Sequence, residues 1–243
     1  MRQVRIFQPG IYGPGERVVL SESACHHVSV VLRMRENQHL TLFPGDNHEY
    51  SAILLSVQKK QLEVLIANKT PMNRESSCGI RLAQGIIKGE GMEWVIQKAV
   101  ELGVTQIYPL LTQHSSVRHD ANFLAKKHAQ WQSIVIGACE QSGRNTLPFI
   151  HPSCTLSSYL SEKTLPTIRW FLNPYGVDAL RSQLHSAQEM TILVGPEGGF
   201  HSNEVFQIQQ AGFKSLTLGP RILRAETAAL AALSVLQARV GDL

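Results

Sequence analysis

Short runs of alternating hydrophobic and polar residues dominate the first seventy positions of the chain. Turn sequences such as Pro44–Asn47 separate them. Alternation with a period of two is typical of half-buried strands, and several such strands at close spacing predict a small β-barrel or sandwich. One helix is predicted among them at Ser21–Leu32, with Ser21 as its N-cap. The five alternating runs are Val4–Phe7, Arg17–Leu20, His39–Phe43, Tyr50–Val57 and Gln61–Ala67.

The pattern changes after Asn68–Ser77, a polar segment that contains a proline and has no hydrophobic periodicity. Compact hydrophobic runs then alternate with segments at helical spacing. This alternation predicts a mostly parallel sheet with helices on both faces. We therefore expect an α/β protein with a small β domain over 1–72 and a larger α/β domain over 73–243. Its expected strands are Ile80–Ile87, Val104–Leu111, Thr167–Leu172, Met190–Gly195 and Ser215–Gly219; its expected helices are Met92–Leu102, Asp120–Cys139, Ser202–Ala211 and Glu226–Val240.

Composition narrows the class of protein only slightly. The 243 residues are 43% hydrophobic and 17% charged, as in ordinary globular proteins. There is no hydrophobic run of about 18 residues and no signal segment at the start, so we expect a soluble, cytoplasmic protein. The four cysteines include no CxxC pair, and we expect reduced thiols and no metal site. A net charge of +4 is compatible with a nucleic-acid partner but does not demonstrate one.

Two glycine-containing loops follow expected strands and are the best candidates for a ligand site. They read GPEGGF at Gly195–Phe200 and LGPRILRAET at Leu218–Thr227. In open α/β sheets, ligands bind beyond the carboxyl ends of the strands. Neither loop has the spacing of a P-loop or a dinucleotide fingerprint. Two tight structural turns are the alternative interpretation.

Charged residues in both loops favour a ligand site over simple turns. Glu197 lies in the first loop, and Arg221, Arg224 and Glu226 flank a short apolar insert in the second. Glycines beside charges are typical of a site that binds one ligand through the backbone and another through charge.

Several long segments, in order along the chain, resemble one known family. LVGPEGGF followed by LGPRILRAETAAL is similar to the signature of the 16S ribosomal RNA uridine-N3 methyltransferases, small-subunit methyltransferase E, of the knotted SPOUT class. QGIIKGEGMEWVIQKAVELGV and ACEQSGRNTLP resemble its central segments, and HHVSVVLRMRENQHLTLFPGDNHEYSAIL resembles its PUA-like RNA-binding domain. The KGEGMEW segment departs from the family in having Glu90 where a basic residue is common.

The resemblance implies a trefoil-knotted parallel sheet that binds S-adenosylmethionine largely through its main chain, in a homodimer with the site at the subunit interface. The turn Asn173–Gly176 is a further candidate for the pocket, although its segment follows no family pattern. The alanine-rich last helix suits a dimer contact, and an ordinary core helix is the alternative. The implied cofactor-binding residues are Leu193, Gly195, Glu197, Gly199, Leu218, Gly219, Ile222 and Leu223.

Methylation of uracil N3 also requires particular side chains. The N3 proton must leave, and negative charge then spreads to the neighbouring carbonyl oxygens, so the site needs a proton acceptor and positioned donors. Arg224, Arg144 and Arg221 are the candidate donors or phosphate clamps, with Arg224 first. Glu197 is the first candidate for the acid or base and Glu226 the second. Glu226 begins a helix, where a negative charge complements the partial positive charge of the helix N-terminus. Glu140 and Gln141 are candidates for positioning the uracil edge.

The first domain contains the candidate RNA contacts. Arg33 and Arg35 flank Met34, so on a strand both would lie on one face, where they could meet phosphate. A solvated charged face is the alternative for each. With Arg221 from the second domain, the expected RNA-binding residues are Arg2, Arg5, His27, Arg33, Arg35 and Arg221.

The function expected from the resemblance is methylation of N3 of one uridine in 16S rRNA on the small ribosomal subunit. Two rivals remain: a SPOUT methyltransferase with a ribose 2′-hydroxyl or tRNA base as target, and a non-catalytic RNA-binding assembly factor.

Overall fold

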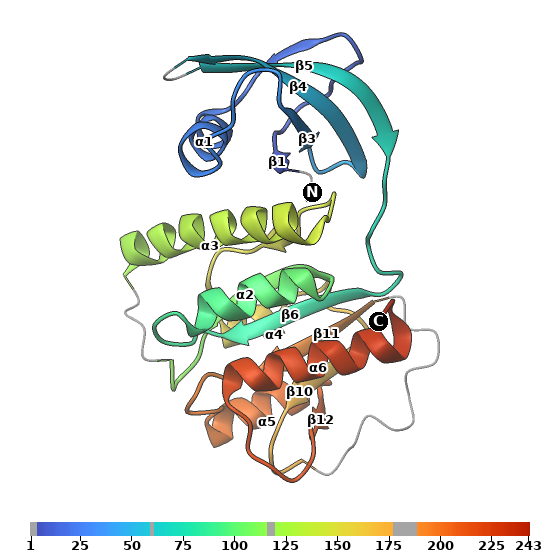
Figure 1. Ribbon diagram of the computed structural model, residues 1–243. Helices are drawn as coiled ribbons and strands as arrows, with labels where there is room; N and C mark the ends of the chain where they lie inside the picture. Colours follow the sequence, from blue (N-terminus) through green and yellow to red (C-terminus); the bar gives the residue numbers. More distant parts are fainter. Residues whose placement is uncertain (1–3, 59–60, 116–119, 177–188) are drawn as a thin grey trace. The chain divides into compact units, whose positions relative to one another are not determined.

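The computed structural model describes residues 4–58, 61–115, 120–176 and 189–243. It divides into two compact units, and Figure 1 labels most of their helices and strands. Unit 1 comprises Met1–Glu75 and Cys139–Leu147, and unit 2 comprises Ser76–Ala138 and Pro148–Leu243. The first long segment of unit 1 thus ends near the boundary expected at residue 72. The hydrophobic pattern does not predict that the short segment Cys139–Leu147 joins unit 1.

Unit 1 is built on a five-stranded sheet in the order β1-β3-β4-β5-β2. The pair β1–β3 is parallel and the other pairs are antiparallel. Inward-facing residues of the strands, such as Leu40, Leu42 and Val64, are fully buried in one core. The strands are β1 (Arg5–Phe7), β2 (Arg17–Val19), β3 (His39–Phe43), β4 (His48–Gln58) and β5 (Gln61–Pro71).

The helix expected at Ser21–Leu32 is present in two parts. The Ser21 hydroxyl accepts a hydrogen bond from the Ala24 N–H, which caps α1 (Glu22–His26). The chain continues directly into a π-helical turn, η1 (His27–Val31).

Unit 2 is built on a sheet whose strand pairs, among the described residues, are all parallel. The strand order is β12-β10-β11-β6-β7-β8, and β9 also pairs with β7. The short strands β8 and β9 were not expected from the sequence. The strands are β6 (Gly79–Gly85), β7 (Val104–Leu111), β8 (Phe149–Ile150), β9 (Cys154–Thr155), β10 (Ile168–Leu172), β11 (Glu189–Val194) and β12 (Lys214–Leu216).

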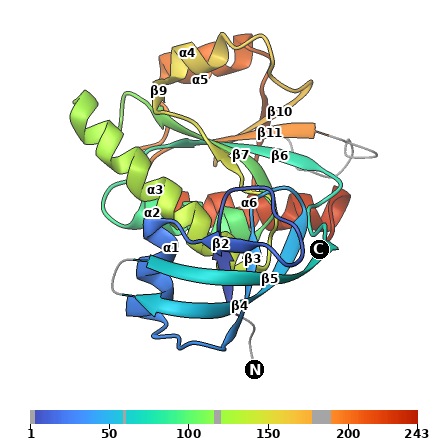
Figure 2. The same ribbon diagram turned by 90° about the horizontal axis from the view of Figure 1, so that it is seen from above.

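Helices cover both faces of this sheet, as the alternating pattern predicted. Figure 2 shows α4 and α5 on one face and α2 and α6 on the other. Phe171 and Leu193 pack with Tyr159 of α4 and Ile208 of α5 in one buried cluster. None of the helices in the described segments is both long and apolar enough to cross a bilayer. The helices are α2 (Gly91–Glu101), α3 (Ala121–Ser142), α4 (Leu156–Leu160), α5 (Ser202–Gln210) and α6 (Ala225–Val240).

His151 lies in a partly buried polar cluster beside the sheet of unit 2. Its ring stacks on Tyr108, with centroids 3.7 Å apart and planes 12° apart. Its Nε2 lies 3.1 Å from the Gln106 side-chain oxygen. Burial is the main cause that lowers the pKa of His151 to about 4, and the positive charge of Arg81 contributes to the same shift.

This shift predicts an acid-sensitive contribution to stability. An unfolded histidine binds its proton near pH 6.5, so between pH 6.5 and about 4 the unfolded state binds more protons and stability falls as pH falls. His151→Gln should therefore make the free energy of unfolding less dependent on pH in this window. Urea unfolding from pH 4 to 7.5 measures the slope, with His26→Gln, an exposed site on α1, as control. An unchanged slope in His151→Gln would contradict the assignment.

Candidate functional site

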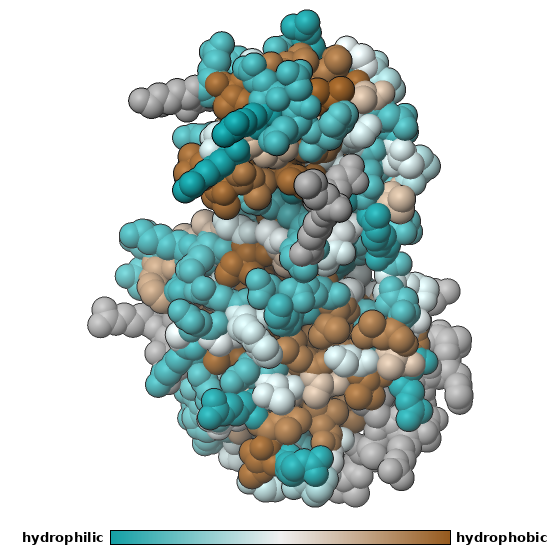
Figure 3. Space-filling view, in the orientation of Figure 1, coloured by the Kyte–Doolittle hydropathy of each residue, from teal (hydrophilic) through white to brown (hydrophobic). Residues whose placement is uncertain are grey.

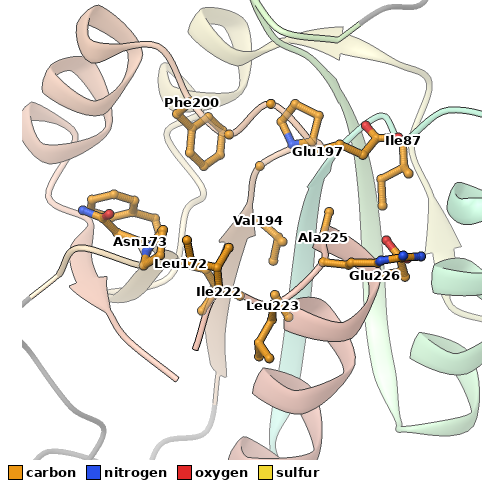
Figure 4. A pocket seen from close by; sticks show the side chains of 18 of the residues that line it. Ile87, Leu172, Asn173, Val194, Glu197, Phe200, Ile222, Leu223, Ala225 and Glu226 are labelled. Atoms are coloured by element: carbon orange, nitrogen blue, oxygen red, sulfur yellow. The ribbon is translucent and has the colours of Figure 1, made fainter. Parts of the chain in front are cut away.

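A cavity of about 1080 Å³ opens in unit 2 at the carboxyl ends of β10 and β11 (Figure 4). Four segments line it: the loop after β11, the turn after β10, the chain entering α6, and the connection from β6 to α2. This is the edge of a parallel sheet at which ligands bind in open α/β folds.

The loop after β11 brings backbone to the cavity. The Gly199 N–H donates to the Pro196 carbonyl over 2.9 Å and closes a turn. Gly199 has φ +67°, a conformation that favours glycine. A Cβ on Gly195 would lie 3.3 Å from the Gly199 backbone and from the Phe200 ring. The glycines therefore leave main-chain groups of this loop uncovered at the cavity.

The neighbouring strand β6 fixes this loop from behind. A Cβ on Gly85 would lie 2.6 Å from Pro196 Cδ and 2.7 Å from the Pro196 nitrogen, so no side chain fits at that position. Gln84 is fully buried, and its Nε2 donates to the Gly195 carbonyl over 3.2 Å. The carboxyl ends of β6 and β11 are thus packed backbone to backbone.

Apolar side chains form the rest of the lining. In Figure 4, Val194 lies in the middle, with Phe200 on one side and Ile222 and Leu223 on the other. Ile222 is 76% exposed, unusually high for an isoleucine at a pocket. This open apolar surface suits the planar ring of a ligand.

The turn after β10 is tied to the chain that follows β12. The Thr217 hydroxyl contacts the carbonyl oxygens of Asn173 and Gly176, at 3.0 and 2.7 Å. The Asn173 side-chain oxygen accepts the Tyr175 N–H over 3.0 Å. These bonds hold two sides of the cavity at a fixed separation.

The charged side chains at the cavity differ in the hydrogen bonds and ion pairs that they make. The Glu197 Oε1 accepts the Lys88 backbone N–H over 3.0 Å. Arg224 is the N-cap residue of α6, but its side chain makes no capping bond and is exposed. Within the described part of the chain, no carboxylate lies within ion-pair distance of its guanidinium. Glu226 lies in the first turn of α6, where its charge complements the helix N-terminus.

The structure brings together most of the cofactor-site residues expected from the two loops. Leu193 was expected at the cavity but does not line it. Side chains alternate along a strand, so Leu193 is buried on the side of the sheet that α4 and α5 cover, and its neighbour Val194 lines the cavity. Leu218, Gly219 and Arg221 belong to the lining segment but do not line the cavity themselves. The expected residues that line it are Gly195, Glu197, Gly199, Ile222, Leu223, Arg224 and Glu226.

Two arginines expected at functional positions are instead in a buried polar cluster of unit 1. Arg5 pairs with Glu49 and donates to the Asn145 side-chain oxygen over 2.6 Å. Arg144 is 4% exposed and pairs with Glu75. These ion pairs occupy both guanidiniums, so the structure does not support Arg5 as an RNA contact or Arg144 as a catalytic donor.

Glu140 also has partners within unit 1. One carboxylate oxygen accepts the Phe7 N–H over 3.0 Å, and the other lies 3.1 Å from Nδ1 of the half-buried His27. Burial raises the pKa of Glu140 above its usual range. Glu140 and His27 thus engage each other within unit 1, and the roles expected for them from the sequence stay predictions.

Arg33 and Arg35 are exposed, but they lie in a loop that follows η1 rather than on a strand. Arg33 has φ +52°. The expectation that strand alternation places both on one face is therefore wrong. Arg2 lies outside the described residues. In the described segments, no group of three or more histidine, cysteine, aspartate or glutamate side chains could hold a metal ion.

The sequence reasoning missed one wall of the cavity. Ile87 and Lys88, between β6 and α2, and Gly91, the first residue of α2, line it. The glycines around Lys88 were the available signal, since they allow a tight connection into the helix. The turn residues Asn173, Pro174 and Tyr175, a candidate on sequence, also line it.

Family models match both parts of the chain. An RNA methyltransferase domain matches residues 74–237, and an RNA methyltransferase PUA domain matches residues 20–67. Fold and site thus define an RNA methyltransferase with a PUA-like first domain and an α/β second domain.

Relatives narrow the class further. The chain is 36% identical over 237 residues to ribosomal RNA small subunit methyltransferase E of Buchnera aphidicola, covering 93% of this chain and 92% of the relative. Among solved structures, the same enzyme from Neisseria gonorrhoeae, bound to S-adenosylmethionine, is 37% identical with a TM-score of 0.92. A Legionella pneumophila protein described as a methyltransferase in complex with the same cofactor is 46% identical with a TM-score of 0.97. Both structural matches cover 100% of each chain. This chain belongs to the ribosomal RNA small subunit methyltransferase E family.

Proposed function

We propose that this chain transfers the methyl group of S-adenosylmethionine to N3 of one uridine in 16S rRNA, in the cytoplasm, with the small ribosomal subunit as substrate. The observation that carries the proposal is that two loops separated in sequence by α5 and β12, GPEGGF and the segment that contains Ile222 and Leu223, contribute to one cavity. The names of the relatives and the cofactor in two of the solved structures support it.

The residues of the cavity fit this cofactor. A volume of about 1080 Å³ suits a nucleoside joined to an amino acid. Val194, Ile222 and Leu223 offer an apolar surface for adenine. At Gly195 the backbone itself faces the neighbouring loop residues, because a Cβ there would lie close to Gly199 and Phe200. We further propose that the chain after β12 is threaded as a trefoil knot around this site. The bonds from Thr217 to the turn after β10 support that proposal.

The chain's own residues would prepare the uracil for methylation. The bound cofactor supplies an electrophilic methyl group on a sulfonium. When the N3–methyl bond forms, the sulfur–methyl bond would break and S-adenosylhomocysteine would leave, while the N3 proton passes to an acceptor. The Glu197 carboxylate is the candidate acceptor, with one oxygen oriented by the Lys88 N–H. The Arg224 guanidinium can donate to the carbonyl oxygens that gain negative charge. Arg221 and Lys88 are exposed cations suited to RNA phosphate.

Unit 1 is proposed to bind the RNA, in keeping with the PUA-domain match. Its exposed Arg33 and Arg35 can neutralise phosphates, which fixes register without reading sequence.

We also propose that the enzyme is a homodimer that pairs through α6. Ala229, Ala232 and Leu233 of this helix are fully buried in the unit's own core. Its outer surface carries apolar residues beside polar ones such as Thr227 and Arg239, and Figure 3 shows hydrophobic side chains gathered where α6 crosses the front of unit 2. Val235, on that surface, is 39% exposed. A partner's equivalent helix would remove this surface from water.

The reaction and its target are tested together in a strain that lacks the gene. We expect mass spectrometry of nucleosides from its 16S rRNA to show loss of 3-methyluridine, restored by the gene. Loss of a 2′-O-methyl or tRNA mark would instead indicate a different target. An unchanged nucleoside profile, with no binding of S-adenosylhomocysteine by calorimetry, would indicate a non-catalytic assembly factor.

Arg224→Ala should reduce kcat by about 10²- to 10³-fold, the usual effect of removing a donor to developing charge. The affinity for S-adenosylhomocysteine should change by less than about threefold, since apolar groups and backbone hold the cofactor. Methylation of isolated 30S subunits and calorimetry measure the two quantities. Lys126→Ala, an exposed site on α3, is the control. A collapse of cofactor affinity in Arg224→Ala would contradict the assigned role.

Val235→Glu should convert the dimer to a monomer, because a buried unpaired carboxylate costs several kcal/mol. Light scattering at micromolar concentrations gives the mass, and Lys126→Glu controls for added negative charge. A protein that remains dimeric with Glu at position 235 would place the interface elsewhere.

A further inference from the structure

His114 lies in the loop after β7 and contacts the GPEGGF loop from outside the cavity. Its Nδ1 is 2.9 Å from the Gly198 carbonyl oxygen and 3.2 Å from the Gly199 carbonyl oxygen. Carbonyl oxygens only accept hydrogen bonds, so Nδ1 must carry the proton. Gly198 and Gly199 line the cavity, whereas His114 does not.

The contact between the two loops is close as well as polar. A Cβ on Gly198 would lie 2.9 Å from the His114 Cβ, closer than such atoms approach in real structures. The glycine at this position therefore allows the histidine to reach the two carbonyls.

A separate hydrogen bond holds the loop that contains His114. The neighbouring Gln113 N–H donates to Oε1 of the buried Glu204 over 2.8 Å. The other oxygen of Glu204 accepts the His201 N–H over 2.9 Å, as part of the capping box of α5. The histidine backbone is thus held next to the helix that follows the GPEGGF loop.

We propose that His114 is a positioning residue that sets the orientation of the peptide groups in the GPEGGF loop and thereby the affinity for the methyl donor. The C=O and N–H of a trans peptide point in opposite directions. A histidine that fixes the Gly199 carbonyl consequently fixes the direction of the Phe200 N–H. This role rests on the proposed function, because it assumes that the cavity holds the cofactor.

The experiment compares His114→Ala, His114→Asn and Gln113→Ala in the full-length protein. Asparagine can place an amide N–H near the position of Nδ1, and Gln113→Ala keeps the backbone bond to Glu204. We expect His114→Ala to raise the KM for S-adenosylmethionine and the Kd for S-adenosylhomocysteine about 3- to 10-fold, as expected for one or two lost hydrogen bonds. The kcat should change less than twofold. His114→Asn should recover most of the affinity, and Gln113→Ala should match the wild type.

Hydrogen exchange of peptides covering Gly195–Phe200, measured without ligand, tests the positioning independently of the cofactor. Exchange should be faster in His114→Ala and restored in His114→Asn. Unchanged exchange, or wild-type cofactor affinity in His114→Ala, would overturn the inference. A wild-type protein that does not bind S-adenosylhomocysteine but shows the exchange effect would overturn the proposed function and leave the anchoring of the loop standing.

Discussion

The structure of the site depends on one steric constraint, the contact of the Pro196 backbone with Gly85 at the carboxyl ends of two paired strands. The virtual Cβ of Gly85 falls 2.6 Å from Pro196 Cδ, so only a residue without a side chain allows this contact. Because the loop after β11 bends against β6, its next residues turn back and present backbone to the cavity. The Gly85 position, which lies outside both loop motifs, is as necessary to the cavity as the glycines that line it.

Much of the second domain could be predicted from the sequence, because its strands and helices have distinct hydrophobic periods. The long strands β6, β7 and β11 appear within a few residues of the expected bounds. The two-residue strands β8 and β9 are too short to show any period, and their pairing with β7 depends on tertiary packing. The loops were found because glycines and charges are unusual at strand ends. Their partners Lys88 and Gln84 were missed, since a backbone N–H and a buried amide leave no distinctive pattern.

The roles of the arginines could not be predicted from the sequence. Arg5 and Arg144 are 139 positions apart, yet the Arg5 guanidinium donates to the Arg144 carbonyl in one buried cluster. Nothing in the local pattern distinguishes a guanidinium that pairs with a distant carboxylate from one that faces RNA. A buried arginine must be paired, because desolvating an isolated charge is costly. The carboxylates of Glu49 and Glu75 therefore determine which arginines are unavailable to a ligand.

This pairing also explains why a net charge of +4 says little about the partner. The cations that can meet an anionic ligand are those left after internal pairing, and in the described residues these include Arg33, Arg35, Arg221 and Arg224. Arg224 combines exposure with a place at the cavity, at the first turn of a helix whose N-terminus carries partial positive charge. A single exposed cation at a cavity attracts an anion to that place, whereas a net charge spread over the surface does not select one. The distribution of charge among paired and unpaired arginines, rather than its total, therefore links the fold to its RNA substrate.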